Sequence, residues 1–277
     1  MYVVVHFTVY DLLSLSRRPM YFALIKFTFL RYAHYPLEVF AVVARKMLEI
    51  GGLLVFWYVV GKTGNLELET KFLLSYFLIG GAVSEIVMVS SLKWGRNIQK
   101  LVKRGELSVY LIRPVSFLRY HLAYYVGSSG IDYLLAFLNL AIGIIILGEL
   151  SIARVTLFML FLITSFFLSV ALNIFIAIIA LYTEEAKHFK NVANHIIRIF
   201  SGILVPITFF PEALEKITQW SPFPVLVFGP VNSLQSGEWT GDFGQQLLIG
   251  GVWILLLLPL SIFLWRYSLK KYDGVGI

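Results

Sequence analysis

Residues 155–182 read VTLFMLFLITSFFLSVALNIFIAIIALY and contain no charged side chain. A helix needs about 20 mainly apolar residues to cross the roughly 30 Å of hydrocarbon in a bilayer. This run is long enough to do so, and we expect it to form a transmembrane helix.

The composition extends this expectation to the whole chain. Of its 277 residues, 58% are hydrophobic and 14% are charged, whereas soluble globular domains have roughly 45–50% apolar and about 25% charged residues. The sequence therefore predicts an all-α integral membrane protein, with six transmembrane helices in a single transmembrane domain over residues 1–277. The expected spans are residues 37–61, 72–93, 127–148, 155–182, 191–210 and 246–265.

The basic residues predict the topology, because cytoplasmic loops of membrane proteins are enriched in Lys and Arg. With a cytoplasmic N-terminus, both tails and residues 93–126 and 183–198 are cytoplasmic, and residues 62–71, 149–154 and 211–245 are outside. Nineteen of the twenty-three basic residues then lie in or beside cytoplasmic segments, and four face outwards: Lys62, Lys71, Arg154 and Lys216. We therefore expect a multi-pass protein of the cell (inner or plasma) membrane with both termini in the cytoplasm. The net charge of +7 follows from this asymmetry and does not indicate a nucleic-acid partner.

The segment before the first span differs from a transmembrane helix. Residues 17–34 combine apolar and aromatic side chains with cations at Arg17, Arg18, Lys26 and Arg31. This pattern favours an interfacial helix lying on the membrane over a seventh span or a plain juxtamembrane segment. Residues 1–16 have no basic n-region and no small-residue cleavage site, so we do not expect a signal peptide.

Residues 206–245 are apolar but rich in proline and glycine. A straight transmembrane helix cannot contain so many helix breakers, and irregular backbone at membrane depth must be covered by protein or water. We therefore expect short broken helices in the last outer loop.

Two motifs resemble catalytic or nucleotide-binding sequences. Gly61-Lys62-Thr63 matches the end of a phosphate-binding loop, but Phe56 stands where its first glycine is needed, so we do not expect this chain to bind ATP. The segment Gly127-Ser128-Ser129-Gly130 has the form found around the nucleophile of intramembrane serine proteases, and His188 or His195 would have to act as the base. Close helix packing through small residues explains this segment equally well.

A metal centre and cysteine chemistry are not predicted. Glu185, His188 and His195 lie on one helical face, but matching metal-binding pairs on other helices are not apparent. The chain has no cysteine, which excludes disulfides and thiol nucleophiles.

Three acids lie within or at the edge of apolar runs: Glu49, Glu85 and Asp132. A charge near the bilayer centre costs about 3 kcal/mol on insertion scales, so such groups face the bundle interior, a partner or water. We expect these acids either to pair helices, with Arg45 and Lys46 beside Glu49, or to line a translocation path.

The most distinctive cytoplasmic segment runs from Lys93 to Ser116. Leu101, Leu107 and Leu111 lie among cations, which predicts a short amphipathic element that ends at a turn before Pro114. Such a surface suits docking to another protein, and binding to anionic membrane lipid is the alternative.

The order of three patterns along the chain resembles the permeases of ATP-binding-cassette (ABC) transporters of the type-2 exporter class. The first is a loop pattern with Lys103, Arg104, Gly105, Glu106, Leu107, Arg113 and Pro114. The second is an outer-loop signature with Pro206, Pro211, Glu212, Pro222, Pro224 and Pro230, and the third is the basic tail over residues 264–272. The tail lacks the family's usual extra glycines.

The resemblance implies that two such permeases, identical or similar, pair in the membrane and that separate ABC ATPase subunits dock beneath them. ATP and Mg²⁺ would then bind to the ATPase, and the loop around Arg104 and Glu106 would transmit its closure to the spans. The resemblance implies a transport subunit of an exporter that is not itself an enzyme. The alternatives are an ATP-independent secondary transporter or channel, a membrane scaffold, and the intramembrane serine protease.

Overall fold

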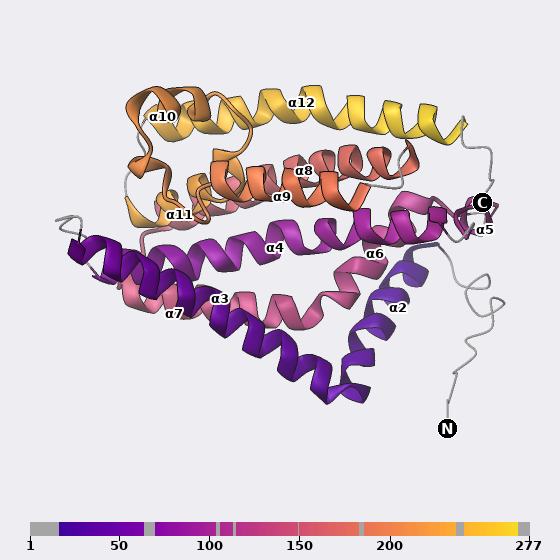
Figure 1. The fold of residues 1–277 in the computed structure, drawn as a ribbon, viewed down its shortest axis with the longest axis horizontal. Coiled ribbons are helices and arrows are strands. Elements are labelled where there is room, and N and C mark those ends of the chain that lie inside the picture. Colours follow the sequence, from indigo (N-terminus) through magenta and orange to yellow (C-terminus); the bar gives the residue numbers. More distant parts are fainter. Residues whose placement is uncertain are drawn as a thin grey trace.

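A computed structural model describes residues 17–63, 70–103, 106–112, 115–148, 150–182, 186–236 and 241–270. Every regular element in these ranges is a helix, which confirms the all-α prediction (Figure 1). The helices are α2 (Arg17–Leu30), η1 (Arg31–His34), α3 (Pro36–Thr63), α4 (Thr70–Lys103), α5 (Leu107–Leu111), α6 (Phe117–Ser128), α7 (Gly130–Leu147), α8 (Ile152–Tyr182), α9 (Ala186–Phe200), η2 (Ile207–Phe209), α10 (Glu212–Gln219), η3 (Pro224–Leu226), α11 (Phe228–Gln235) and α12 (Gly241–Lys270).

Four of the described helices are long and apolar enough to cross a bilayer. Their apolar segments are Lys71–Met88 in α4, Gly130–Leu147 in α7, Ile152–Ile179 in α8 and Asp242–Lys270 in α12. Large apolar side chains such as Ile145, Ile152 and Leu255 are exposed on their outer faces. A protein in water rarely exposes such a surface, whereas lipid covers it without cost, and the protein is therefore a membrane protein.

The two other predicted spans differ from these four. Residues 37–61 do form one helix, α3, but Glu38, Arg45, Lys46 and Glu49 make its first half too polar to count among the long apolar helices. The prediction of a continuous span over residues 191–210 is wrong, because α9 ends at Phe200. Gly202 follows with a φ of 85° and Pro206 begins a short 3-10 helix, and neither conformation continues an α-helix.

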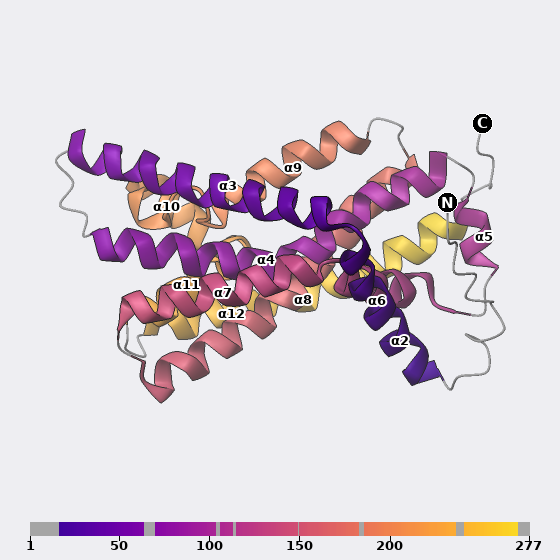
Figure 2. The ribbon, with the colours of Figure 1, turned by 90° about the horizontal axis from the view of Figure 1, so that it is seen from below.

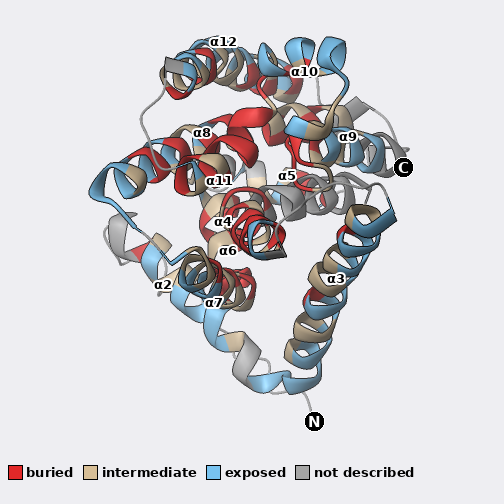
Figure 3. Cartoon of the chain, turned by 90° about the vertical axis from the view of Figure 1, so that its left-hand side faces the viewer, coloured by how far each residue is buried: buried red, intermediate tan, exposed pale blue. Residues whose placement is uncertain are grey.

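Helix α4 lies at the centre of the bundle (Figure 3). Of the residues in its apolar segment, 67% are buried, against 17% in α12. It packs most extensively against α7 and α8, and less extensively against α6, α11 and α3. The main hydrophobic core therefore forms around Tyr76, Ile79 and Val83 of α4, with Phe161 and Leu168 of α8 facing them.

The long helices run roughly alongside one another, and the predicted outside segments share one end of the bundle (Figures 1 and 2). The end of α3, the start of α4, the end of α7, the start of α8 and the short helices α10 and α11 all lie there. Helix α5 and the C-terminal end of α12 lie at the opposite end. This arrangement agrees with the alternation of loops predicted from the basic residues.

The N-terminal segment forms α2 and η1 over residues 17–34, with the predicted bounds. Helix α2 packs against α6. A Cβ atom on Gly127 would lie 1.9 Å from Thr28 Oγ1, and one on Gly130 would lie 1.9 Å from the Phe29 ring. Glycine at these two positions therefore lets α2 approach the junction of α6 and α7.

The predicted short broken helices between α9 and α12 are confirmed, as η2, α10, η3 and α11. The prolines of this segment stand mainly at helix starts. Pro206 and Pro211 precede η2 and α10, and Pro224 is the first residue of η3. Proline suits these positions because N–H groups at the start of a helix have no intrahelical acceptor, so the N–H that proline lacks is not needed there. Of the six signature residues, Pro211 and Glu212 are exposed, and the other four are buried: Pro206, Pro222, Pro224 and Pro230.

Candidate functional site

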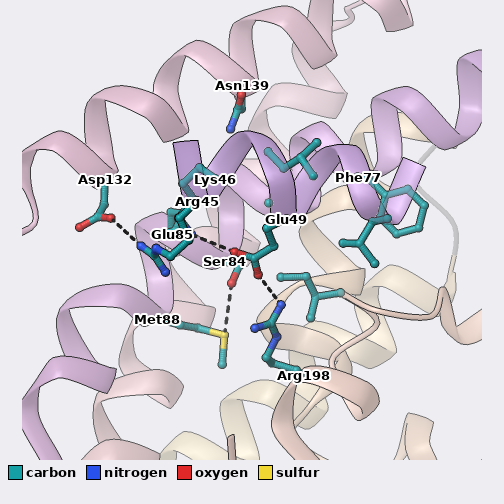
Figure 4. Close-up of a pocket in the computed structure, with 14 residues that line it drawn as sticks. Arg45, Lys46, Glu49, Phe77, Ser84, Glu85, Met88, Asp132, Asn139 and Arg198 are labelled. Atoms are coloured by element: carbon teal, nitrogen blue, oxygen red, sulfur yellow. Dashed lines mark hydrogen bonds and ion pairs between the residues drawn. The ribbon is translucent and has the colours of Figure 1, made fainter. Parts of the chain in front are cut away.

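The three acids predicted from their apolar surroundings line one cavity (Figure 4). Glu49 comes from α3, Glu85 from α4 and Asp132 from the first turn of α7. The cavity has a volume of about 160 Å³ and also contacts Ser84 and Asn139. Residues far apart in the sequence thus form a single polar site inside an apolar bundle.

Each acid has a basic partner. Arg45 Nη2 lies 3.7 Å from Asp132 Oδ1, and Lys46 Nζ lies 3.6 Å from Glu49 Oε2. Lys46 also forms an ion pair with Glu85. The prediction that Lys46 pairs with Glu49 is confirmed, whereas Arg45 pairs with Asp132 instead.

Arg198 of α9 completes the site, with its Nη2 atom 2.5 Å from Glu49 Oε1. We call the six residues the ion-pair cluster: Arg45, Lys46, Glu49, Glu85, Asp132 and Arg198. Three cations balance three anions, so the cluster is formally neutral. Neutrality matters here because an uncompensated charge in a low-dielectric site is far more costly than a paired one.

The sequence of α3 places the three residues that it contributes to the cluster on one face of the helix. Arg45 and Glu49 are four residues apart, and Lys46 and Glu49 are three apart, so their side chains emerge from neighbouring positions. This face points at α4, α7 and α9 (Figure 4). The opposite face exposes Met47 and Leu48, which are suited to lipid or to another protein.

Two atoms of the cluster have no hydrogen-bond partner among the described residues. They are Glu85 Oε2 and Arg198 Nε, and both are buried. Both residues line the cavity. Buried polar atoms are usually satisfied by protein or water, so these two give the cavity one free acceptor and one free donor for water or a small polar solute.

Trp57 provides a second attachment of α3, farther along the helix. Its ring stacks on Phe77 of α4 and on Phe209 of η2, with centroid distances of 6.2 and 5.1 Å. Its Nε1–H donates to the Leu204 carbonyl oxygen, with 3.0 Å between the two atoms. Helix α3 is therefore held to the bundle by charges in its first half and by an aromatic contact in its second half.

Two residues of the site were not predicted. Arg198 lies in the run Ile196-Ile197-Arg198-Ile199-Phe200, and its isolation among apolar residues is the signal that could have identified it. Trp57 lies inside an apolar run of aromatic residues, where no pattern distinguishes it from a lipid-facing ring.

The loop pattern expected to contact an ATPase is described only in part. Arg104, Gly105, Arg113 and Pro114 lie outside the described residues, and Lys103 ends α4. Glu106 and Ile112 are exposed on either side of α5, the short helix predicted before Pro114.

Leu107 anchors α5 and is fully buried. It belongs to a second core cluster with Leu101 of α4, Phe117 of α6, Ile174 of α8 and Trp265 of α12. Phe117 and Trp265 stack with their centroids 5.6 Å apart. Through this cluster, α5 is connected to four longer helices.

The candidate nucleophile Ser129 is fully buried at the junction of α6 and α7. The adjacent glycines admit α2, so close helix packing accounts for the small residues of this segment. Among the histidines considered as a base, His195 is exposed on α9, and the His188 side chain and Glu185 lie outside what the structure describes. Among the described residues, no group of three or more His, Asp or Glu side chains could hold a metal ion.

The chain also matches a known protein family. A family model described as "ABC-2 family transporter protein" matches residues 54–276. This region includes the last ten residues of α3 and all the described helices that follow it. No curated protein matches the chain.

Proposed function

The chain belongs to the ABC-2 family of transporter proteins, and from this premise we propose that it forms the translocation path of an exporter as a dimer driven by a separate ATPase subunit. The family match over residues 54–276 is the observation that carries this proposal. ATP and Mg²⁺ bind to the partner ATPase in this scheme, which is consistent with the incomplete phosphate-binding loop around Lys62.

The proposed topology has six spans in one membrane domain and both termini in the cytoplasm. Helix α3 supplies a fifth crossing, and α9 together with the irregular segment that follows Phe200 supplies a broken sixth crossing. Their charged residues face each other across the ion-pair cluster, which lowers the cost of placing α3 and α9 in the membrane. Helix α2 lies at the cytoplasmic interface, and α10 and α11 lie towards the outer leaflet.

The segment from Lys103 to Pro114 is the proposed docking site for the ATPase. Exposed Glu106 and Ile112 offer a polar and an apolar contact, and buried Leu107 links them to the core. ATP-driven closure of the ATPase would press on α5, and the second core cluster would pass that movement to α4, α6, α8 and α12. This is a mechanical route from nucleotide to membrane helices.

The ion-pair cluster is the proposed point at which the helices rearrange. It joins α3 to α4, α7 and α9 through three ion pairs, and a fourth pair, Lys46–Glu49, lies within α3. Lys46 thus contacts two acids on different helices. A cation shared by two carboxylates can change its main partner when the helices shift, so each arrangement keeps its charges paired. Alternating access requires two such arrangements of similar free energy.

A second candidate function is that of an ATP-independent transporter or channel. The cavity in the ion-pair cluster favours it, because ionisable residues inside a membrane domain often lie on ion or proton paths. In that case Glu85, with its unpartnered Oε2 atom, would bind the ion.

Reconstitution in liposomes distinguishes the two functions. The permease is reconstituted with the ATPase that co-purifies with it, and candidate substrates are supplied with ATP, without ATP, or with an ion gradient alone. The proposal expects transport only with ATP. Transport at the full rate under an ion gradient alone would favour the second function.

A further inference from the structure

An apolar groove lies between α3 and α4. It is formed towards the end of α3 and the start of α4, which lie at the same end of the bundle (Figure 2). It has a volume of about 240 Å³ and is lined by Leu54, Val55 and Tyr58 of α3 and by Leu73 and Leu74 of α4. The ion-pair cluster contributes no residue to its lining. The groove is therefore a separate site with apolar walls.

Two lysines lie one helical turn beyond wall residues of this groove, towards the connection between α3 and α4. Lys62 follows Tyr58 by four residues on α3, and Lys71 precedes Leu74 by three residues on α4. These spacings place each lysine on the same helical face as a wall residue, one turn closer to the helix end. Both lysines are exposed, close to the point where α3 ends and α4 begins.

The Lys62 side chain is also oriented by Tyr58. Its Nζ atom lies 4.9 Å from the centroid of the Tyr58 ring, which is within the range of a cation–π contact. Hydrogen bonding with the Tyr58 side chain raises the pKa of Lys62. The Lys62 ammonium group therefore lies beside Tyr58, a residue of the apolar groove wall.

We infer that this groove binds one phospholipid with an anionic headgroup, with an acyl chain between α3 and α4 and the headgroup phosphate at Lys62 and Lys71. An apolar slot below a pair of cations matches the two ends of a phospholipid. Lysine side chains at helix ends reach the headgroup level while their stems remain in the apolar layer. Charge complementarity favours this occupant over an apolar helix face, because an apolar face offers no anionic group to the two ammonium groups.

Native mass spectrometry of the purified protein in detergent tests the inference. The probes are phosphatidylglycerol and, as the neutral comparison, phosphatidylcholine. A Lys62→Gln/Lys71→Gln double variant should retain phosphatidylglycerol roughly ten- to thirtyfold less well, since each lysine near an anionic surface contributes about a factor of five. Leu74→Trp should fill the groove and reduce the retention of both lipids.

Lys216→Gln is the matched control, because Lys216 is an exposed lysine on α10, outside the groove. It should leave phosphatidylglycerol retention unchanged, and the melting temperatures of the lysine variants should equal that of the parent protein. Glu67 and Glu69 lie in the connection between the two lysines but outside the described residues. The test therefore uses substitutions of the lysines alone. Unchanged retention in the double variant, or an equal loss in Lys216→Gln, would overturn the inference.

A second experiment identifies the occupant independently of transport or ATPase binding. The chain has no cysteine, so Val55→Cys introduces a single thiol in the groove wall. With a lipid in the groove, oxidation in native membranes should leave the chain monomeric on a denaturing gel. A disulfide-linked dimer in high yield would show that a second copy occupies the groove, and this would contradict the inference.

Discussion

Arg198 on α9 forms an ion pair with Glu49 on α3, with 2.5 Å between Nη2 and Oε1 (Figure 4). About one third of each side chain is exposed, 33% for Arg198 and 31% for Glu49. Lys216 and Glu212 of α10 form a pair with the same distance, 2.5 Å, but their side chains are 71% and 81% exposed. Solvent screening is therefore the main difference between these two pairs.

Loss of the Arg198–Glu49 pair should destabilise the protein measurably. We expect Arg198→Gln to lower the free energy of unfolding by about 1–2 kcal/mol, because Glu49 loses its closest partner in a partly buried site. The measurement is unfolding by SDS in mixed micelles. A double-mutant cycle with Glu49→Gln isolates the pair from other effects of each substitution.

The exposed pair on α10 is the control for this experiment. Lys216→Gln should change the free energy of unfolding by less than about 0.5 kcal/mol, because water screens the charges of this pair. If Arg198→Gln and Lys216→Gln have equally small effects, the Arg198–Glu49 pair does not hold α9 to α3.

Lys46 should contribute more than Arg198, because its pair with Glu85 is more deeply buried. Their side chains are 11% and 10% exposed. Lys46→Met leaves the Glu85 carboxylate buried without its cation, which costs about 3–5 kcal/mol. A Lys46→Met/Glu85→Gln double variant should recover most of this loss in the same unfolding assay. An equal loss in the single and double variants would show that the lysine stem, and not its charge, stabilises the site.

The turn after α9 depends on glycine at position 202. The backbone φ of Gly202 is 85°, and a Cβ atom there would lie 3.0 Å from Tyr76 Oη and 3.1 Å from Phe228 Cβ. Gly202→Ala should therefore lower the free energy of unfolding by at least about 1–2 kcal/mol. The comparison is Gly251→Ala in α12, where a Cβ atom meets nothing within 4 Å. That substitution should stabilise the protein by about 0.5–1 kcal/mol through helix propensity.

Exposed and buried residues at the start of α5 should have separable roles. Glu106→Lys should abolish substrate-stimulated ATP hydrolysis in the assembled transporter without changing the melting temperature, because Glu106 is exposed. Leu107→Ala should instead destabilise the fold by about 2–5 kcal/mol, because Leu107 is fully buried. Lys216→Glu, a charge reversal at the opposite end of the bundle, is the control. Normal stimulation in Glu106→Lys would remove this residue from the coupling surface.

Apolar length and proline content were enough to predict most helices. The long apolar runs of α7, α8 and α12 are expected to form membrane-spanning helices. The prolines between residues 206 and 230 interrupt any long helix, which predicts the short helices there. The end of α9 was not predictable in the same way. Residues 201–205 are as apolar as a helix end, and only the positive φ of Gly202 shows that the chain turns. The Gly202 carbonyl accepts a hydrogen bond from the Tyr76 hydroxyl, a long-range contact that local sequence does not reveal.

Sequence predicts those site residues whose charge is energetically costly in an apolar segment. Glu49, Glu85 and Asp132 are acids in apolar runs, and that cost alone identified them. Their partners depend on which helix faces are adjacent, which local sequence does not contain. Arg45 therefore pairs with Asp132 across two helices instead of with its neighbour Glu49, and Arg198 joins the cluster across 149 residues of sequence.

The central claim is that this chain works with a separate ATPase, and co-purification tests it most directly. The protein is tagged in its native membrane, extracted gently as an intact complex, and its partners are identified by mass spectrometry. We predict a stoichiometric ATPase subunit with a complete phosphate-binding loop, present with two permease chains. An intact complex that contains no ATPase subunit and still transports its substrate would contradict the account.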